Sequence, residues 1–297
     1  MRIRHHHVTG ESMMCCQLRR LLAAFVMLAG AAAAFAPGSA RAETFHTCAG
    51  FIDSVPATIT SQGVWCLRKD LSTNITSGNA ITIATNNVTI DCNDFKVGGL
   101  AAGDASMAVG IYAEGRQNAT VRNCSVRGFL GGIFINGGAG HLVEDNRLDN
   151  NLSAGILSLG DNILVQRNRV FDTGGFAEGS VFGIRVEGDV IDNTVAGVYT
   201  TAAYENAYGI DLGGHGSVAR NNTVRGLVSS NKAFGIDASS GAFRGSTIDG
   251  NQVVVPAGTS GRGVTGYSDL TFCRNNLIDG FDTAMEYCVD AGGNITL

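Results

Sequence analysis

The sequence predicts an all-β solenoid, a parallel β-helix in which short strands wind into about eight stacked coils. Three observations indicate this fold class. A Gly-Ile step recurs every 22 to 28 residues, from Gly110-Ile111 to its last, Gly-Val variant at Gly263-Val264. A polar residue, usually asparagine, recurs with it, two positions before an apolar one. Between turn residues the apolar side chains alternate over runs of only three to six residues, which is typical of short strands.

The composition agrees with strands and tight turns. The 297 residues include 41 glycines and only 3 prolines, and 16% are charged. Collagen is excluded because the glycines have no three-residue period, and few charges without heptads argue against a helical bundle. The formal net charge of −5 argues against general nucleic-acid binding, which needs a basic surface.

The first 42 residues are predicted to be a signal peptide that is removed. Arg19 and Arg20 precede an apolar run of 16 residues, and Ala40-Arg41-Ala42 forms a cleavage site. Cleavage would leave 16 basic and 25 acidic side chains, a net charge of −9. We therefore expect an exported protein, periplasmic or extracellular, with no membrane association after cleavage.

Six cysteines follow residue 42, and an even number favours disulfides in an exported chain. This part of the sequence has neither a Cys-x-x-Cys pair nor neighbouring histidines, which a zinc site would need. Pairing between sequence neighbours fits stacked coils best. The expected pairs are Cys48–Cys66, Cys92–Cys124 and Cys273–Cys288.

The recurring polar residues predict a ladder inside one turn of the coil. Stacked coils place equivalent positions directly above one another at the strand spacing of ~4.8 Å, so each amide can bond its neighbours. The expected members are Asn93, Cys124, Asn146, Asn168, Asn193, Asn222, Asn251 and Asn275.

The chain resembles a known group of repeat proteins. GVWCLRKDL (63–71) and AITIATNNVTIDCNDF (80–95), followed by the repeated coils, are similar to the right-handed parallel β-helix proteins of the pectin-lyase-like superfold. The resemblance extends over about residues 60–290 and implies a right-handed coil over residues 63–297, with residues 43–62 as an N-terminal cap and the last residues as a C-terminal cap. It implies no single function, because this fold carries lyases, hydrolases, epimerases, adhesins and binding modules.

The coils also predict one outward-facing file of side chains. If the isoleucine of each Gly-Ile step points into the core, the next residue points outward, and the file reads Tyr112, Phe134, Leu157, Arg185, Asp211, Asp237, Thr265 and Glu286. Asp211 and Asp237 fall on consecutive coils, about 5 Å apart, and Arg185 lies one coil before them. Two carboxylates this close raise one pKa unless a cation compensates. The pair therefore suits acid and base catalysis or a calcium site.

Longer loops point to the same region. The spacing between Gly-Ile steps grows to 26–28 residues where the charged side chains begin, and the extra residues lie at 171–182, 196–208 and 226–234. Loops on a rigid scaffold often carry function. We expect them to wall the outward face with rings for sugar stacking, including Tyr204 and Tyr208. His215 is expected at the edge of this cleft, and Tyr112 and Phe134 are further candidate contacts.

Three functions stay open from the sequence. The first is an exported, carbohydrate-associated protein that binds a polysaccharide along the loop-walled face. The second is a polysaccharide lyase, hydrolase or epimerase, in which Arg185 neutralises a substrate carboxylate while Asp211 and Asp237 act as base, acid or calcium ligands. The third is a structural surface or interaction protein. No cofactor is expected, except that the carboxylates could hold a calcium ion.

No family signature of a carbohydrate-cleaving enzyme is complete. Gly214-His215-Gly216 is similar to the Gly-His-Gly element of polygalacturonases, but their Asn-Thr-Asp, Asp-Asp and Arg-Ile-Lys elements are absent. The Arg-x-Pro-x-x-Arg element of pectate lyases is absent as well, since neither Pro56 nor Pro256 follows an arginine at that spacing. The sequence therefore identifies a fold without a demonstrable catalytic set.

Overall fold

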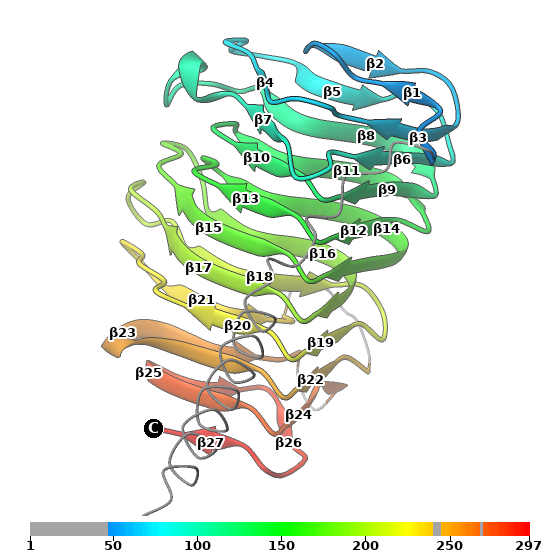
Figure 1. Cartoon of the computed structure of the whole chain (residues 1–297). Helices are drawn as coiled ribbons and strands as arrows, with labels where there is room; N and C mark the ends of the chain where they lie inside the picture. Colours follow the sequence, from blue (N-terminus) through cyan, green and yellow to red (C-terminus); the bar gives the residue numbers. More distant parts are fainter. Residues whose placement is uncertain (1–46, 240–244, 268–269) are drawn as a thin grey trace, which may run out of the picture. The chain divides into compact units, whose positions relative to one another are not determined.

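The computed structural model describes residues 47–239, 245–267 and 270–297, which form a parallel β-helix of about nine turns (Figure 1). These residues contain no α-helix. The predicted all-β class is confirmed. The expected count of about eight coils agrees with this number, and short strands at Gly50–Phe51 and Ala57–Ile59, within the segment predicted as an N-terminal cap, also pair with the coils that follow. The predicted signal peptide and residues 43–46 lie outside the described residues.

Each coil contributes strands to three columns, and within a column every strand pairs in parallel with the equivalent strand of the next coil. Column 1 consists of β2 (Ala57–Ile59), β5 (Asn79–Ile83), β8 (Val109–Gln117), β11 (Gly131–Ala139), the first half of β14 (Ala154–Gln166), the first half of β16 (Val181–Ile191), β18 (Ala207–Gly213), β21 (Ala233–Asp237), the end of β23 (Gln252–Thr265) and the end of β25 (Leu277–Glu286).

Columns 2 and 3 complete the coil. Column 2 consists of β1 (Gly50–Phe51), β3 (Gly63–Cys66), β6 (Val88–Asp91), β9 (Ala119–Arg122), β12 (Leu142–Glu144), the second halves of β14 and β16, β19 (Val218–Arg220), β22 (Thr247–Asp249), β24 (Phe272–Arg274) and β26 (Val289–Asp290). Column 3 consists of β4 (Leu71–Ser72), β7 (Lys96–Gly98), β10 (Ser125–Arg127), β13 (Arg147–Asp149), β15 (Arg169–Gly174), β17 (Thr194–Tyr199), β20 (Thr223–Arg225), the beginnings of β23 and β25, and β27 (Ile295–Thr296). A short 3-10 helix, η2 (Leu100–Ala102), follows β7.

The core is a stack of aliphatic side chains that the three columns turn inward. In column 1 the isoleucines of the Gly-Ile steps lie in register from coil to coil, and all of them are fully buried: Ile111, Ile133, Ile156, Ile184, Ile210 and Ile236. Burying one such side chain contributes roughly 1.5–3 kcal/mol to folding. The repeated isoleucine therefore holds the coils together and aligns them.

The glycine of each step is needed because neighbouring coils approach closely there. A Cβ atom on Gly183 would lie 2.6 Å from the carbonyl oxygen of Gly209, and a Cβ atom on Gly209 would lie 2.6 Å from that of Gly235. Real side chains are not accommodated at such distances. The Gly-Ile step thus combines a close backbone contact with a core anchor, which explains why the two residues recur together.

An asparagine ladder runs along the turn between columns 2 and 3. The backbone N–H of Asn168 donates to Oδ1 of Asn193 at 2.8 Å, and Nδ2 of Asn193 donates to Oδ1 of Asn222 at 3.0 Å. The ladder continues through Asn251 to Asn276 and Asn294, so the predicted member Asn275 is wrong by one position. Asn275 has φ of +55° and forms the corner before the ladder residue. Asn275 and Asn276 are adjacent, so the sequence pattern alone fitted either of them.

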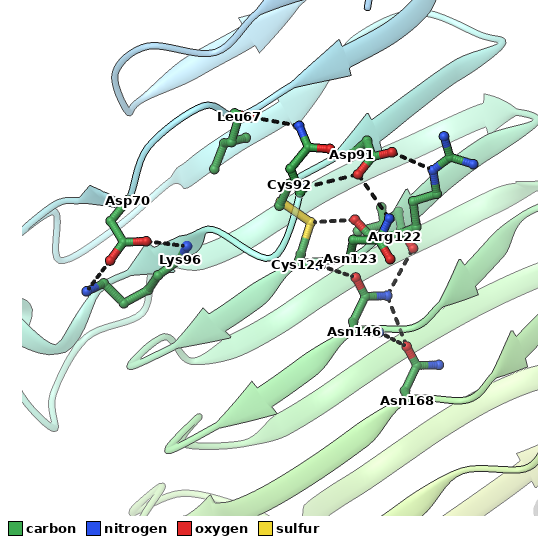
Figure 2. The surroundings of a disulfide bond; sticks show 12 residues. Leu67, Asp70, Asp91, Cys92, Lys96, Arg122, Asn123, Cys124, Asn146 and Asn168 are labelled. Carbon is green, nitrogen blue, oxygen red and sulfur yellow. Dashed lines mark hydrogen bonds and ion pairs between the residues drawn. A yellow bond between two sulfur atoms is a disulfide. The ribbon is translucent and has the colours of Figure 1, made fainter. Parts of the chain in front are cut away.

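A disulfide occupies the N-terminal end of this ladder (Figure 2). Cys92 and Cys124 are buried and joined between adjacent coils, and the backbone N–H of Cys124 donates to Oδ1 of Asn146 at 3.0 Å. Asn93 lies next to Cys92 in the turn between β6 and β7, and its Nδ2 donates to the carbonyl oxygen of Leu67. The covalent bond therefore replaces the amide contact between the first coils.

All three predicted cysteine pairs are confirmed as disulfides: Cys48–Cys66, Cys92–Cys124 and Cys273–Cys288. Their Cα–Cα distances are 5.8, 4.7 and 5.9 Å. Disulfides persist in oxidising compartments, so this set is typical of an extracellular or periplasmic protein.

Candidate functional site

The strand register confirms the predicted outward file in column 1. Tyr112 pairs with Phe134, Phe134 with Leu157, and Leu157 with Arg185. The register then continues from Arg185 through Asp211, Asp237 and Thr265 to Glu286. The charged and polar members come from β16, β18, β21, β23 and β25, so they lie on successive rungs of one face.

Asp211 and Asp237 are buried, with only 4% and 5% of their surfaces exposed. Nε of Arg185 lies 3.2 Å from Oδ2 of Asp211, which places a guanidinium against this carboxylate. Burial raises the pKa of Asp237, although the N–H of Ser239, which donates to it at 2.9 Å, and the charge of Arg262 oppose the shift. The carboxylates thus lie on neighbouring rungs in different electrostatic environments.

An aromatic ladder that the sequence reasoning missed borders these residues. The rings of Phe182, Tyr208 and Phe234 lie on three consecutive rungs of column 1 and are stacked, with centroids 4.9 and 4.8 Å apart. The guanidinium carbon of Arg185 lies 4.9 Å from the Phe182 centroid, and that of Arg262 lies 5.7 Å from the Phe234 centroid. The ladder was readable in the sequence, because an aromatic residue precedes the glycine in FGI, YGI and FGI.

The stacking limits what Tyr208 can offer to a ligand. Both faces of its ring are covered by Phe182 and Phe234, so its hydroxyl edge is the part left for contact. Burial raises the pKa of Tyr208, and its hydroxyl therefore stays protonated at neutral pH. Nδ2 of Asn206 donates to this hydroxyl at 3.3 Å. Tyr208 thus presents a hydroxyl dipole rather than a stacking surface.

Beyond Asp237 the file continues with Thr265 and Glu286. The hydroxyl of Thr265 is buried and has no hydrogen-bond partner among the residues that the structure describes. Glu286 forms an ion pair with Arg262. Arginine–carboxylate pairs therefore stand on both sides of Asp237 along column 1.

The three long loops stack on one another where column 3 leads into column 1. Oγ of Ser180 donates to Oε2 of Glu205 at 2.8 Å, and Nδ2 of Asn231 donates to Oδ1 of Asn206 at 3.0 Å. Oγ of Ser229 donates to the carbonyl oxygen of Glu205 at 2.9 Å. We call these three stacked loops, residues 171–182, 196–208 and 226–234, the loop bank. The loop bank lies beside the first residues of β16, β18 and β21.

The remaining candidate residues lie at different points of the coil. Tyr204 projects from the loop bank with 88% of its surface exposed. Tyr112 and Phe134 lie four and three rungs before Asp211, and the hydroxyl of Tyr112 donates to Oε2 of Glu114 at 2.9 Å. Only Arg185, Asp211, Asp237 and Tyr208 of the predicted set come together.

His215 lies at the opposite ends of the column 1 strands from the loop bank. It lines a cavity of about 560 Å³ together with Asp161, Glu187 and Asp189, and neither Asp211 nor Asp237 lines it. Oε2 of Glu187 accepts the N–H of Gly160, and Oδ1 of Asp189 accepts that of Val218. These carboxylates tie neighbouring turns together.

Two features of the described residues bear on the partner classes. Among residues 47–239, 245–267 and 270–297 no group of three or more histidine, cysteine, aspartate or glutamate side chains could hold a metal ion. In the same part of the chain no helix is long and apolar enough to cross a membrane.

Comparison with known proteins identifies the architecture. The family model described as the right handed beta helix region matches residues 71–204. The chain is a right-handed β-helix repeat protein. The predicted handedness is thereby confirmed. No curated protein matches the sequence of this β-helix protein.

Solved structures of low sequence identity resemble the β-helix protein. The Dettilon tailspike protein (gp208) is 17% identical, with 82% of this chain and 57% of the tailspike aligned and a TM-score of 0.46. The A-module of mannuronan C-5 epimerase AlgE4 from Azotobacter vinelandii is 12% identical, with 82% and 88% aligned and a TM-score of 0.40. The β-helix protein therefore spans little more than half the length of the tailspike.

Proposed function

We propose that this protein is exported by the segment of residues 1–42 and binds a glycan along the outward face of column 1, from β16 to β25. The observation that carries the proposal is the run of Arg185, Asp211 and Asp237 on consecutive rungs beside the loop bank. Carboxylate and guanidinium groups pair well with sugar hydroxyls, since one group only accepts and the other only donates hydrogen bonds.

The physical cost of this arrangement supports a role beyond folding. Equivalent positions of earlier coils hold Phe134 and Leu157, so the coil tolerates apolar side chains in this file. Burying a carboxylate costs free energy unless it is paired and hydrogen-bonded. Residues that break the local rule of a fold are concentrated at functional sites.

The roles of the neighbouring groups follow from their exposure. The Arg185 side chain is 41% exposed and forms an ion pair with Asp211 through Nε, so a ligand on this face can reach its guanidinium group. The protonated hydroxyl of Tyr208 adds a donor on the next rung, on the same strand as Asp211. Tyr204, at the exposed tip of the loop bank, is the ring available for stacking on a sugar.

A binding experiment on a polysaccharide panel tests this proposal. The double variant Asp211→Asn with Asp237→Asn should bind at least tenfold more weakly than the wild-type protein, because two acceptors lose their charge. The matched control is Asp104→Asn with Asp282→Asn, two exposed carboxylates that change the net charge equally. Thermal melting verifies that each variant is folded. Unchanged retention of glycans by the Asp211 and Asp237 variant rules this site out.

A second candidate function is polysaccharide cleavage or epimerisation at the same rungs. The observation that favours it is the difference between the two carboxylates: Asp237 has its pKa raised by burial, whereas Asp211 faces Arg185. When their environments give two neighbouring carboxyl groups different pKa values, one site can supply both an acid and a base. Arg185 would then neutralise a substrate carboxylate.

Turnover separates the two candidates. Purified protein is incubated with the same polysaccharides, with and without calcium, and assayed for new reducing ends, unsaturated products and epimerised residues. Catalysis predicts product formation by the wild-type protein and its loss in Asp237→Asn. Binding without any product leaves glycan association as the function.

A further inference from the structure

A cluster of arginines lies on the outward side of column 3, away from the candidate glycan face of column 1. Arg147 on β13 and Arg169 on β15 occupy neighbouring rungs, and Arg127 on β10 pairs in register with Asp149 on β13 (Figure 1). We call Arg127, Arg147 and Arg169 the arginine cluster. The pattern was present in the sequence, since an arginine follows the ladder asparagine in EDNRLD and QRNRVF.

The cluster has more positive than negative charge. Nε of Arg127 and Nε of Arg147 each lie 3.3 Å from an oxygen of Asp149, so two guanidinium groups share one carboxylate. Arg169 has no carboxylate within ion-pair distance among the described residues. Its guanidinium carbon lies 5.2 Å from the ring centroid of Phe171, and that of Arg147 lies 5.3 Å from the same centroid.

A cleft of about 420 Å³ gives a ligand access to this charge. Arg147, Arg167 and Arg169 line it together with Ser125, Asp94 and Asp145. Arg167 is occupied by Asp145 at 2.8 Å and by Glu144 at 2.6 Å. The N–H groups left for a ligand are therefore mainly those of Arg147 and Arg169.

Like charges on neighbouring rungs of a parallel pair repel each other and destabilise the sheet. Placing Arg169 beside Arg147 without a second carboxylate is therefore unfavourable for the isolated protein. A bound anion would remove the repulsion, because each guanidinium can donate two parallel hydrogen bonds to a carboxylate.

We propose that the arginine cluster binds the carboxylate groups of an acidic polysaccharide. Asp94, Asp145 and Asp149 lie among the arginines and would repel a polymer as densely charged as duplex DNA, which has one negative charge per ~1.7 Å. A polymer with one carboxylate per sugar can place its charges at the guanidinium groups and its neutral atoms beside the acidic side chains. The cluster also provides a local positive charge on a chain whose net negative charge would otherwise disfavour such a ligand.

This site goes beyond the glycan face of column 1 and uses none of its residues. The two proposals therefore fail separately. Loss of binding in the Asp211 and Asp237 variant with full binding in the arginine variant would retain only the first. The reverse pattern would retain only the arginine cluster.

The experiment measures binding of polygalacturonate to the full chain at low salt. Arg147→Gln with Arg169→Gln should weaken binding at least tenfold, and the charge-matched control Arg220→Gln with Arg274→Gln on column 2 should bind like the wild-type protein. Arg169→Lys keeps the charge without the planar fork and should give an intermediate loss. Binding should weaken as salt is raised, since the site is exposed.

Neutral dextran, a short DNA duplex and vesicles of phosphatidylcholine and phosphatidylserine serve as competing probes. The proposal is overturned if the Arg147 and Arg169 variant binds polygalacturonate as tightly as the wild-type protein, or if the wild-type protein does not bind it. Equal affinity for dextran contradicts recognition of carboxylates. Tighter binding to the duplex or to the vesicles than to polygalacturonate would also overturn the proposal, in favour of that other partner.

Discussion

The early coils, residues 79–159, and the late coils, residues 181–286, have the same inside and a different outside. Both turn an isoleucine or valine inward at the Gly-Ile step, and both continue one column of register. Outward, the early coils carry Phe134 and Leu157, whereas the late coils carry Arg185, Asp211 and Asp237. Folding requires apolar side chains in the inward file, whereas the outward side chains can differ between coils without loss of the core.

At the turn between columns 2 and 3, the start of the early coils differs from all the coils that follow. The first coils are joined there by Cys92–Cys124, and the following coils by asparagine side chains. A covalent bond acts on the unfolded chain, because it limits the conformations open to the loop that it closes. The amide ladder acts on the folded chain, because it satisfies buried backbone groups. Variants can separate the two effects.

The largest effect is expected from removing the disulfide of the early coils. Cys92→Ala with Cys124→Ala should lower the free energy of unfolding by about 4 kcal/mol, because the bond closes a long loop. The Cys273–Cys288 disulfide closes a loop with a sequence separation of 15 rather than 32 residues. Its removal by Cys273→Ala with Cys288→Ala should therefore lower the free energy of unfolding by less. Urea unfolding measures both. A greater loss from the C-terminal pair would contradict the loop-length argument.

A smaller effect, equal in the early and the late coils, is expected from removing one asparagine of the ladder. Asn146→Ala in the early coils and Asn222→Ala in the late coils should each cost about 2–3 kcal/mol, because each leaves buried backbone groups without a partner. Asn146 bonds the carbonyl oxygen of Val121, and Asn222 bonds that of Val190. The exposed Gln252→Ala serves as the control in urea unfolding. Unequal costs would show that the insides of the two regions are not equivalent.

The smallest effect concerns the pH dependence of the outer carboxylates. Burial raises the pKa of Asp237, so the folded state favours its protonated form, and stability is lost as pH rises above the usual carboxyl pKa. Asp237→Asn should therefore stabilise the protein at pH 7 and lose that advantage toward pH 3. Urea unfolding across this range measures the trend.

Asp249 provides the opposite case. The hydrogen bond from Arg274 lowers the pKa of Asp249, so its contribution to stability is present at neutral pH and is lost as pH falls through the folded pKa. Asp249→Asn should destabilise the protein at pH 7 and have little effect at low pH. The same sign for the Asn variants of Asp237 and Asp249 would contradict the assignment of their environments.

Much of the fold was predictable because the repeat is local. One Gly-Ile step per coil aligns all equivalent positions, so the outward file followed from counting, and cysteines close in sequence could pair only between nearby coils. The ladder residue after Asn251 was missed by one position, because Asn275 and Asn276 are adjacent and only the backbone shows which turns inward.

The candidate site was predictable in part. Arg185, Asp211 and Asp237 share rungs, as the spacing indicated. The covered faces of Tyr208 and the distance of His215 from the loop bank were not, because they depend on how each corner turns the chain. The arginine cluster did not follow from the Gly-Ile step, because that step aligns the strands of column 1 and the arginines lie on β10, β13 and β15 of column 3.

The sequence by itself determined the coil and which residues of the Gly-Ile strands share a rung, because a repeated step aligns equivalent positions, and it favoured cross-links between cysteines that are neighbours in sequence. Only the tertiary structure decided which outward groups are buried, which rings cover one another and which guanidinium groups share a carboxylate. Those properties depend on the depth and direction of side chains from different coils, and a period along the chain contains no information on either.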